Sequence, residues 1–144
     1  MSVSRQMLVK ERYNMRIAIV DDSSSVRMMI SLCLEDLEVK EDEVFEFPSA
    51  IEAVEDFSNN YYDLIFCDLN MPEMDGYDLV KAIYEKFPHF ESSRIIMVSG
   101  EEDASYKKIL KEFDVHHFIK KPIQPPIFIH HIKPLVEKAK RKHR

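Results

Sequence analysis

The sequence predicts an α/β fold, a doubly wound parallel sheet of five strands with five helices. Short apolar runs rich in Ile, Val and Phe alternate along the chain with longer segments in which apolar residues recur at helical spacing. Four of the short runs are followed directly by acidic, hydroxyl or basic side chains, as expected where parallel strands end. The chain has 144 residues, 45% of them hydrophobic, so it can bury one core and form one domain.

The strands are predicted from short apolar runs bounded by turn signals. The clearest run, residues 63–67, is apolar and partly β-branched or aromatic, as in a strand that is covered on both faces. Pro72 and Gly76 forbid its continuation. The other strands are predicted at residues 16–20, 43–47, 94–98 and 117–120.

The helices are predicted from caps and from apolar spacing. Asp22 and Ser23 offer a cap for the first helix, whose apolar residues recur at helical spacing as far as Leu37. The third helix must end before Pro88, since the residue that precedes a proline disfavours the helical conformation. The remaining helices are predicted from Pro48-Ser49 to about Phe57, from Asp75-Gly76 to Phe87, from Glu102 to Phe113, and from Pro125-Pro126 toward Lys140.

Five βα units joined by right-handed crossovers give a doubly wound sheet, most simply in the flavodoxin-like strand order 2-1-3-4-5. We therefore divide the chain into an N-terminal extension (1–14), one domain (15–140) and a basic C-terminal tail (141–144).

Chemically active side chains follow four of the predicted strands. Asp21 and Asp22 end the first strand, Asp68 the third, Ser99 the fourth and Lys121 the fifth. A single Asp after a strand is usually a turn former or a helix cap. The carboxyl ends of parallel strands meet at one edge of the sheet. Because polar side chains follow four of these ends, together they predict a functional site instead.

The residue types at this edge suit phosphoryl transfer. Asp22 and Asp68 could each give Mg²⁺ one carboxylate oxygen, Asp21 could hold a coordinated water, and the backbone carbonyl of Asn70 could complete the protein's share of an octahedron. A carboxylate that attacks a phosphoryl group needs such a cation, because the phosphoryl oxygens repel it. Phosphate would then form an aspartyl phosphate on Asp68, with its oxygens held by two catalytic side chains, Lys121 and Ser99.

Between residues 15 and 140 the chain resembles the receiver domain of two-component response regulators, and more specifically the stand-alone, chemotaxis-like type. The resemblance rests on the strand-end residues together with the turn Met71-Pro72 to Asp75-Gly76 and the pair Lys121-Pro122. It implies the same magnesium ligands and phosphate-binding residues. It also implies that the protein is no enzyme in the usual sense but a phosphoacceptor switch that catalyses its own phosphorylation and dephosphorylation.

The resemblance further implies partners and a switch. A sensor histidine kinase or a phosphotransfer protein would supply the phosphoryl group, and a target protein would dock on the face made by the fourth helix, fifth strand and fifth helix. Ser99 and Phe118 would carry the switch, although Phe118 lacks the hydroxyl of the Tyr common in receivers. Asn70 and Glu101 would tune dephosphorylation, and both are polar, so we expect an aspartyl phosphate that lasts seconds to minutes.

Two alternatives stay open. The chain could be a receiver cut from a longer regulator such as a transcription factor. It could also be a small phosphohydrolase with an Asp nucleophile, like the haloacid-dehalogenase type. Those hydrolases need a second Asp two residues after the nucleophile, where this chain has Asn70.

Charge and hydropathy limit the possible partners and the location. Residues 17–132 hold 24 acidic and 10 basic side chains, which argues against nucleic-acid binding by the body of the domain. The basic tail is better explained as a solvated helix end, where cations suit the helix dipole. No apolar stretch is long enough to cross a membrane, so a cytoplasmic protein without a membrane partner is expected.

Cysteine and histidine spacing predicts no further metal. Cys33 and Cys67 lack Cys-x-x-Cys spacing, so reduced core thiols are expected. The pairs His116-His117 and His130-His131 do not predict zinc, because adjacent residues in a strand point to opposite faces and no third ligand stands at a suitable spacing.

Overall fold

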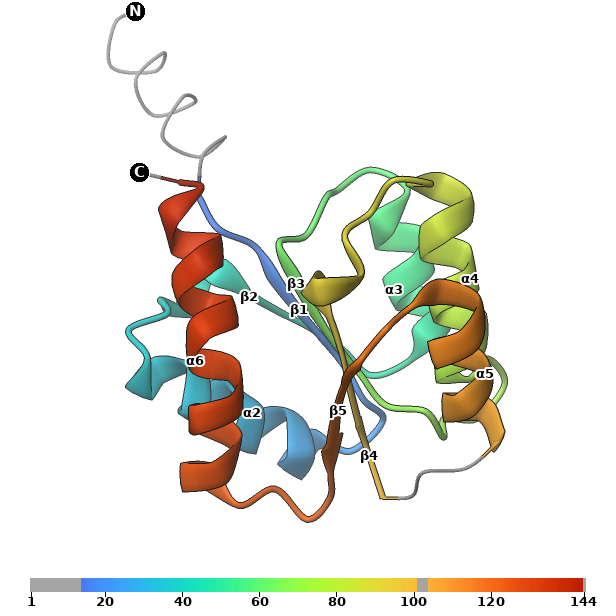
Figure 1. Ribbon diagram of the computed structural model, residues 1–144. Helices are drawn as coiled ribbons and strands as arrows, with labels where there is room; N and C mark the ends of the chain where they lie inside the picture. Colours follow the sequence, from blue (N-terminus) through green and yellow to red (C-terminus); the bar gives the residue numbers. More distant parts are fainter. Residues whose placement is uncertain (1–13, 101–103, 144) are drawn as a thin grey trace, which may run out of the picture.

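The computed structural model describes residues 14–100 and 104–143, and it contains the predicted five-stranded parallel sheet (Figure 1). The strand order is β2-β1-β3-β4-β5, as predicted. The strands are β1 (Ile17–Val20), β2 (Val44–Phe47), β3 (Leu64–Cys67), β4 (Ile95–Ser99) and β5 (His117–Lys120). The fourth strand was predicted to end at Val98. In the structure it continues to Ser99, which pairs with Lys120.

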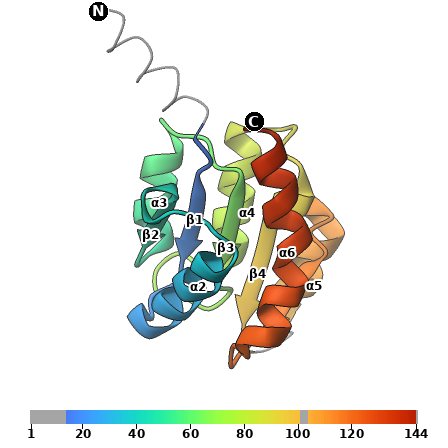
Figure 2. The ribbon, with the colours of Figure 1, turned by 90° about the vertical axis from the view of Figure 1, so that its left-hand side faces the viewer.

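Helices cover both faces of the sheet. One face carries α2 (Ser24–Asp36) and α6 (Pro125–Arg141), which lie side by side in front of the strands in Figure 2. The other face carries α3 (Ala50–Phe57), α4 (Gly76–Lys86) and α5 (Ala104–Phe113) (Figure 1). The fourth helix was predicted from Glu102, which lies outside the described residues, and its described part ends at Phe113 as predicted.

Polar side chains fix where three of the helices begin. The Ser23 hydroxyl accepts a hydrogen bond from the backbone N–H of Val26, so Ser23 is the cap of α2. The Ser49 hydroxyl caps α3 in the same way. Asp75 caps α4 and exchanges hydrogen bonds with Asp78, which forms a reciprocal capping box. Each cap satisfies a backbone donor that would otherwise lack a partner.

The sheet divides the core into two layers. Strands β1, β3 and β4 are buried throughout, because helices cover both of their faces. Their side chains alternate, so neighbours in sequence enter different layers: Phe66 packs toward α2 and α6, and Ile65 toward α3, α4 and α5. Packing on both faces holds these strands, and with them the side chains that follow their carboxyl ends. Among the described residues, no helix is long and apolar enough to span a bilayer.

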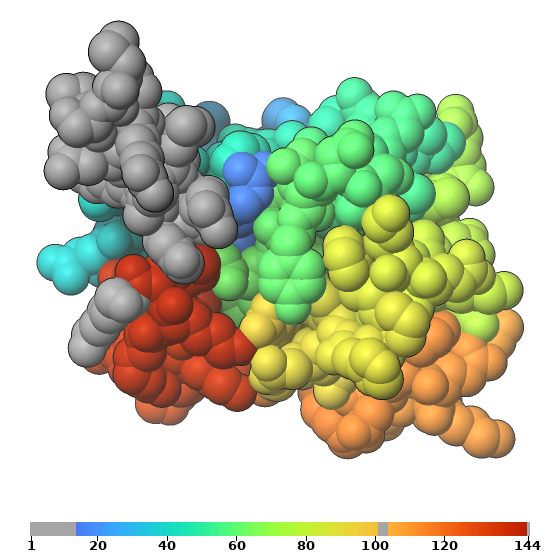
Figure 3. All heavy atoms as spheres, turned by 90° about the horizontal axis from the view of Figure 1, so that it is seen from above, coloured from blue at the N-terminus to red at the C-terminus, as the bar shows by residue number. Residues whose placement is uncertain are grey.

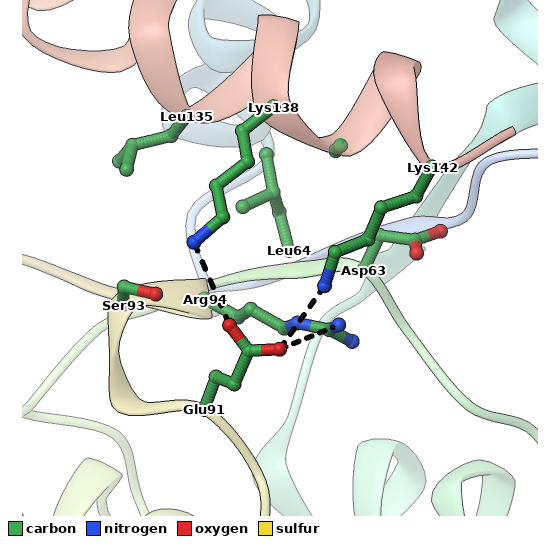
Figure 4. Close-up of a pocket in the computed structure, with 9 residues that line it drawn as sticks. Asp63, Leu64, Glu91, Ser93, Arg94, Leu135, Lys138 and Lys142 are labelled. Carbon is green, nitrogen blue, oxygen red and sulfur yellow. Dashed lines mark hydrogen bonds and ion pairs between the residues drawn. The ribbon is translucent and has the colours of Figure 1, made fainter. Parts of the chain in front are cut away.

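The end of α6 is fastened to the short turn that precedes β4. The Glu91 carboxylate forms ion pairs with three cations (Figure 4). Its oxygens lie 3.1 Å from a guanidinium nitrogen of Arg94, 3.0 Å from Lys142 Nζ and 3.6 Å from Lys138 Nζ. Figure 3 shows this end of α6, in red, against the yellow segment before β4. The hydrogen bond from Lys142 and the charge of Arg94 lower the pKa of Glu91. Lys138 and Lys142 thus pair with Glu91 while their side chains stay partly exposed to solvent.

Candidate functional site

The predicted strand-end side chains converge at one edge of the sheet. The Lys121 ammonium lies 2.8 Å from Asp21 Oδ2 and 3.3 Å from Asp68 Oδ2, so one lysine bridges two carboxylates. Asp21, Asp68 and Ser99 are buried, with exposed fractions of 1%, 5% and 0%. Asp22 is exposed, and carboxylate oxygens of Asp21, Asp22 and Asp68 lie within 4.8 Å of one another.

Backbone hydrogen bonds beyond the strands hold these residues in place. The N–H of Asp68 donates to the carbonyl of Val20 at 3.0 Å, and the N–H of Asp21 donates to the carbonyl of Phe47 at 3.1 Å. The N–H of Lys121 donates to the carbonyl of Ser99 at 2.8 Å. The ladder therefore continues one residue past the strands, and the side chains sit on a rigid backbone and not on loose loops.

The charges at the edge are strongly coupled. Burial raises the pKa of Asp68, and the nearby Asp21 carboxylate raises it further, against the opposing effect of Lys121. Burial by itself would lower the pKa of Lys121, but its contacts with Asp21 and Asp68 outweigh burial and raise it. Lys121 therefore stays charged. The ionised form of Asp68 is less favourable than that of an aspartate exposed to solvent.

The acidic cluster fits a divalent cation with a preference for oxygen ligands. Three carboxylates and one ammonium leave two uncompensated negative charges, the charge that one Mg²⁺ would balance. Asp21 Oδ1 accepts the N–H of Ser23 at 2.9 Å and its Oδ2 faces Lys121, which suits contact through water better than direct ligation. Asp22 and Asp68 are then the candidate direct ligands. Bound there, Mg²⁺ would neutralise charge on phosphoryl oxygens.

Asn70 and Ser99 lie on the other side of Asp68. The N–H of Asn70 donates to Asp68 Oδ1 at 3.3 Å, and its side-chain amide lies 3.5 Å from the Ser99 hydroxyl. Phe118 on β5 is half-buried and packs against Tyr106 of α5, with ring centroids 4.6 Å apart. Glu101, predicted to tune dephosphorylation, lies outside the described residues.

Sequence reasoning named Gly76 but missed its close packing against Asp68. A Cβ at this position would lie 2.4 Å from the carbonyl oxygen of Asp68 and 2.9 Å from the Cα of Leu69. The N–H of Gly76 donates to the carbonyl of Leu69 at 2.9 Å. The first turn of α4 therefore packs directly on the backbone of Asp68, which only glycine allows. From the sequence, Gly76 was interpreted as a strand breaker, as the start of a helix and as part of the turn that the family shares, and none of these predicts its contact with Asp68.

Comparison with known proteins agrees with this geometry. The model of the response regulator receiver domain matches residues 17–133. The chemotaxis protein CheY homolog of Campylobacter jejuni is 32% identical over 78% of this chain and 85% of that protein. Hybrid signal transduction histidine kinase L of Dictyostelium discoideum is 29% identical over 76% of this chain, which spans only 6% of that protein.

A solved structure shows the same fold and similar size. The Vibrio cholerae chemotaxis protein CheY4 superposes with a TM-score of 0.69 and 27% identity, covering 84% of this chain and 98% of that one. The family model covers most of the chain, and a relative above 30% identity matches 78% of it. The chain therefore belongs to the family of response regulator receiver domains.

Proposed function

We propose that this protein accepts a phosphoryl group on Asp68 from a histidine kinase or a phosphotransfer protein, and that the phosphate switches its binding to a target protein. The observation that carries the proposal is the bridge from Lys121 to the buried carboxylates of Asp21 and Asp68. Such a bridge opposes the rise that burial and Asp21 impose on the pKa of Asp68, and it places a cation where phosphoryl oxygens would come to lie. A cytoplasmic location is part of the proposal.

The transfer would proceed by attack of one Asp68 carboxylate oxygen on phosphorus. A P–O bond forms to Asp68 while the P–N bond to the donor imidazole breaks, and the electron pair leaves with the imidazole. Asp22 and Asp68 would hold Mg²⁺, with Asp21 acting through water and the Asn70 carbonyl as a further ligand. Lys121 and the Ser99 hydroxyl would bind the oxygens of the transferred group.

Mass spectrometry tests the acceptor. Incubated with acetyl phosphate and Mg²⁺, the wild-type protein and an Asp36→Ala control should each gain one phosphate, since Asp36 is exposed at the end of α2. The Asp68→Ala variant should gain none. One phosphate on Asp68→Ala would overturn the assignment of the acceptor.

The switch would run from Asp68 through the neighbouring strands. Phosphate would draw the buried Ser99 hydroxyl toward it and free space into which Phe118 moves, which reshapes the surface of α5, β5 and α6. Asn70 and Glu101 are proposed to set how fast water removes the phosphate, within seconds to minutes.

Enzyme kinetics separates the switch from a small phosphohydrolase. Sustained turnover of a phosphorylated metabolite would favour the phosphohydrolase. Release of phosphate from Asp68 without such turnover fits the switch. Because the chain spans 6% of one relative and 85% of another, a receiver within a longer regulator stays an alternative to a stand-alone protein.

A further inference from the structure

Two histidines far apart in sequence meet between β5 and α6. The Nδ1 atom of His117 lies 3.2 Å from Nε2 of His131, and the two imidazole planes are inclined at 76°. They belong to the pairs His116-His117 and His130-His131, whose spacing in the sequence does not predict a metal site. The fold joins one member of each pair, a combination that spacing along the chain does not reveal.

The distance between the two nitrogens matches the bite of a metal chelate. With metal–nitrogen bonds of about 2.0–2.1 Å and tetrahedral angles, two imidazole nitrogens on one zinc lie about 3.3 Å apart. The observed separation of 3.2 Å, at which one ring nitrogen hydrogen-bonds the other, is close to this value, so a bound ion would take the place of that hydrogen bond. His117 would carry its proton on Nε2 and His131 would carry its proton on Nδ1. The lone pairs of His117 Nδ1 and His131 Nε2 are then free to bind the ion.

Access and a neutral His117 ring also suit an ion of this class. His131 lines an open hollow of about 400 Å³ with Phe118, Lys120 and Ile127, and both imidazoles are half-exposed. Burial, followed by the proximity of His131 and His116, lowers the pKa of His117, so its ring is neutral at neutral pH. Lys121 at the rim of the hollow points to Asp21 and Asp68 and not to the imidazoles.

We propose that His117 and His131 bind one borderline transition-metal ion, Cu²⁺, Ni²⁺ or Zn²⁺, through Nδ1 and Nε2, with water at its remaining positions. The site is distinct from the acidic cluster. Within residues 14–100 and 104–143 the only group of three or more His, Cys, Asp or Glu side chains close enough for a metal is Asp21, Asp22 and Asp68, so the histidine site has two protein ligands. Affinity should follow Cu²⁺ over Ni²⁺ and Zn²⁺, and Mg²⁺ should not compete.

Calorimetric titration of the full chain with Ni²⁺, freed of any affinity tag and in excess Mg²⁺ to fill the acidic cluster, tests the proposal. His117→Asn and His131→Asn should each weaken binding by about tenfold or more, since each removes one of two ligands. The matched controls are His116→Asn and His130→Asn, which replace the neighbouring histidines and should bind as the wild type does. Equal affinity in all five proteins, or a loss confined to the controls, would overturn the site.

Imidazole NMR of the wild type with Zn²⁺ gives a readout that needs no variant. The ¹⁵N signals of His117 Nδ1 and His131 Nε2 should move together at one equivalent, while those of His116 and His130 stay. Lowering the pH below the usual imidazole pKa of about 6.5 should release the ion, because protons compete for the same lone pairs. Signals of His117 and His131 that stay unmoved by Zn²⁺ would refute the chelate.

Discussion

At the scale of single residues, Gly76 shows how closely α4 packs against the backbone of Asp68. Its missing side chain lets α4 begin against the backbone of Asp68, where a Cβ would lie 2.4 Å from the carbonyl oxygen. That neighbour is backbone, which cannot rotate away as the tip of a flexible side chain could. A change of one methyl group here must therefore move either the helix or Asp68.

We expect Gly76→Ala to destabilise the fold by about 1–3 kcal/mol, as overpacking of a close contact does. The melting temperature should fall by roughly 2–4 °C for each kcal/mol lost. Labelling by acetyl phosphate should slow as well, since the displaced backbone carries Asp68. Gly100→Ala is the control, because a Cβ at Gly100 meets no atom within 4 Å. Equal melting temperatures for the two variants would contradict the steric argument.

At the scale of elements, α6 is held at its far end by the carboxylate of Glu91. That carboxylate pairs with Arg94, Lys138 and Lys142, yet it is about half exposed, so solvent and salt screen each pair. Exposed pairs contribute little singly, and only the convergence of three cations on one anion makes a measurable effect reasonable. The network therefore adds little to the stability of the domain.

Glu91→Gln should lower the free energy of unfolding by about 1 kcal/mol or less, and added salt should shrink the difference. The pKa of Glu91 is lowered in the folded state, so its contribution is present above the ordinary value of 4.5 and is lost as pH falls through the folded pKa. Denaturant unfolding at neutral and at acid pH measures this. Glu137→Gln, the same charge change on exposed α6 surface, is the control. A difference between wild type and Glu91→Gln that persists in acid would argue against the ion pairs.

At the scale of the whole molecule, the proposed signal passes across the sheet from Asp68 to α5, β5 and α6. Beryllofluoride imitates the phosphoryl group, and we expect it to shift backbone NMR signals along β4, β5 and both flanking helices. Ser99→Ala should keep the shifts near Asp68 and lose most of those on α5 and α6, because it removes the hydroxyl that would be drawn inward. Shifts confined to the surroundings of Asp68 in the wild type would contradict the proposed output surface.

The sequence predicted the strand order and the convergence of acidic, hydroxyl and lysine side chains, because both follow from local signals. An apolar run, a cap or a proline marks an element, and parallel connection then brings strand ends together. It could not predict that His117 meets His131 or that Glu91 meets Lys142. Those contacts depend on how α6 is rotated and seated on the sheet, which side-chain packing over the whole core decides.

The fastening of α6 also has a practical consequence for building reagents. His143 lies 2.9 Å from the Asp63 carboxylate, at the start of β3, so the end of α6 and the start of β1 share the edge of the sheet opposite Asp68 (Figure 1). A fluorescent label or a surface tether attached to the last turn of α6 would leave the Asp68 edge uncovered. Immobilised protein should thus report on phosphoryl donors and on docking partners with little obstruction from its attachment.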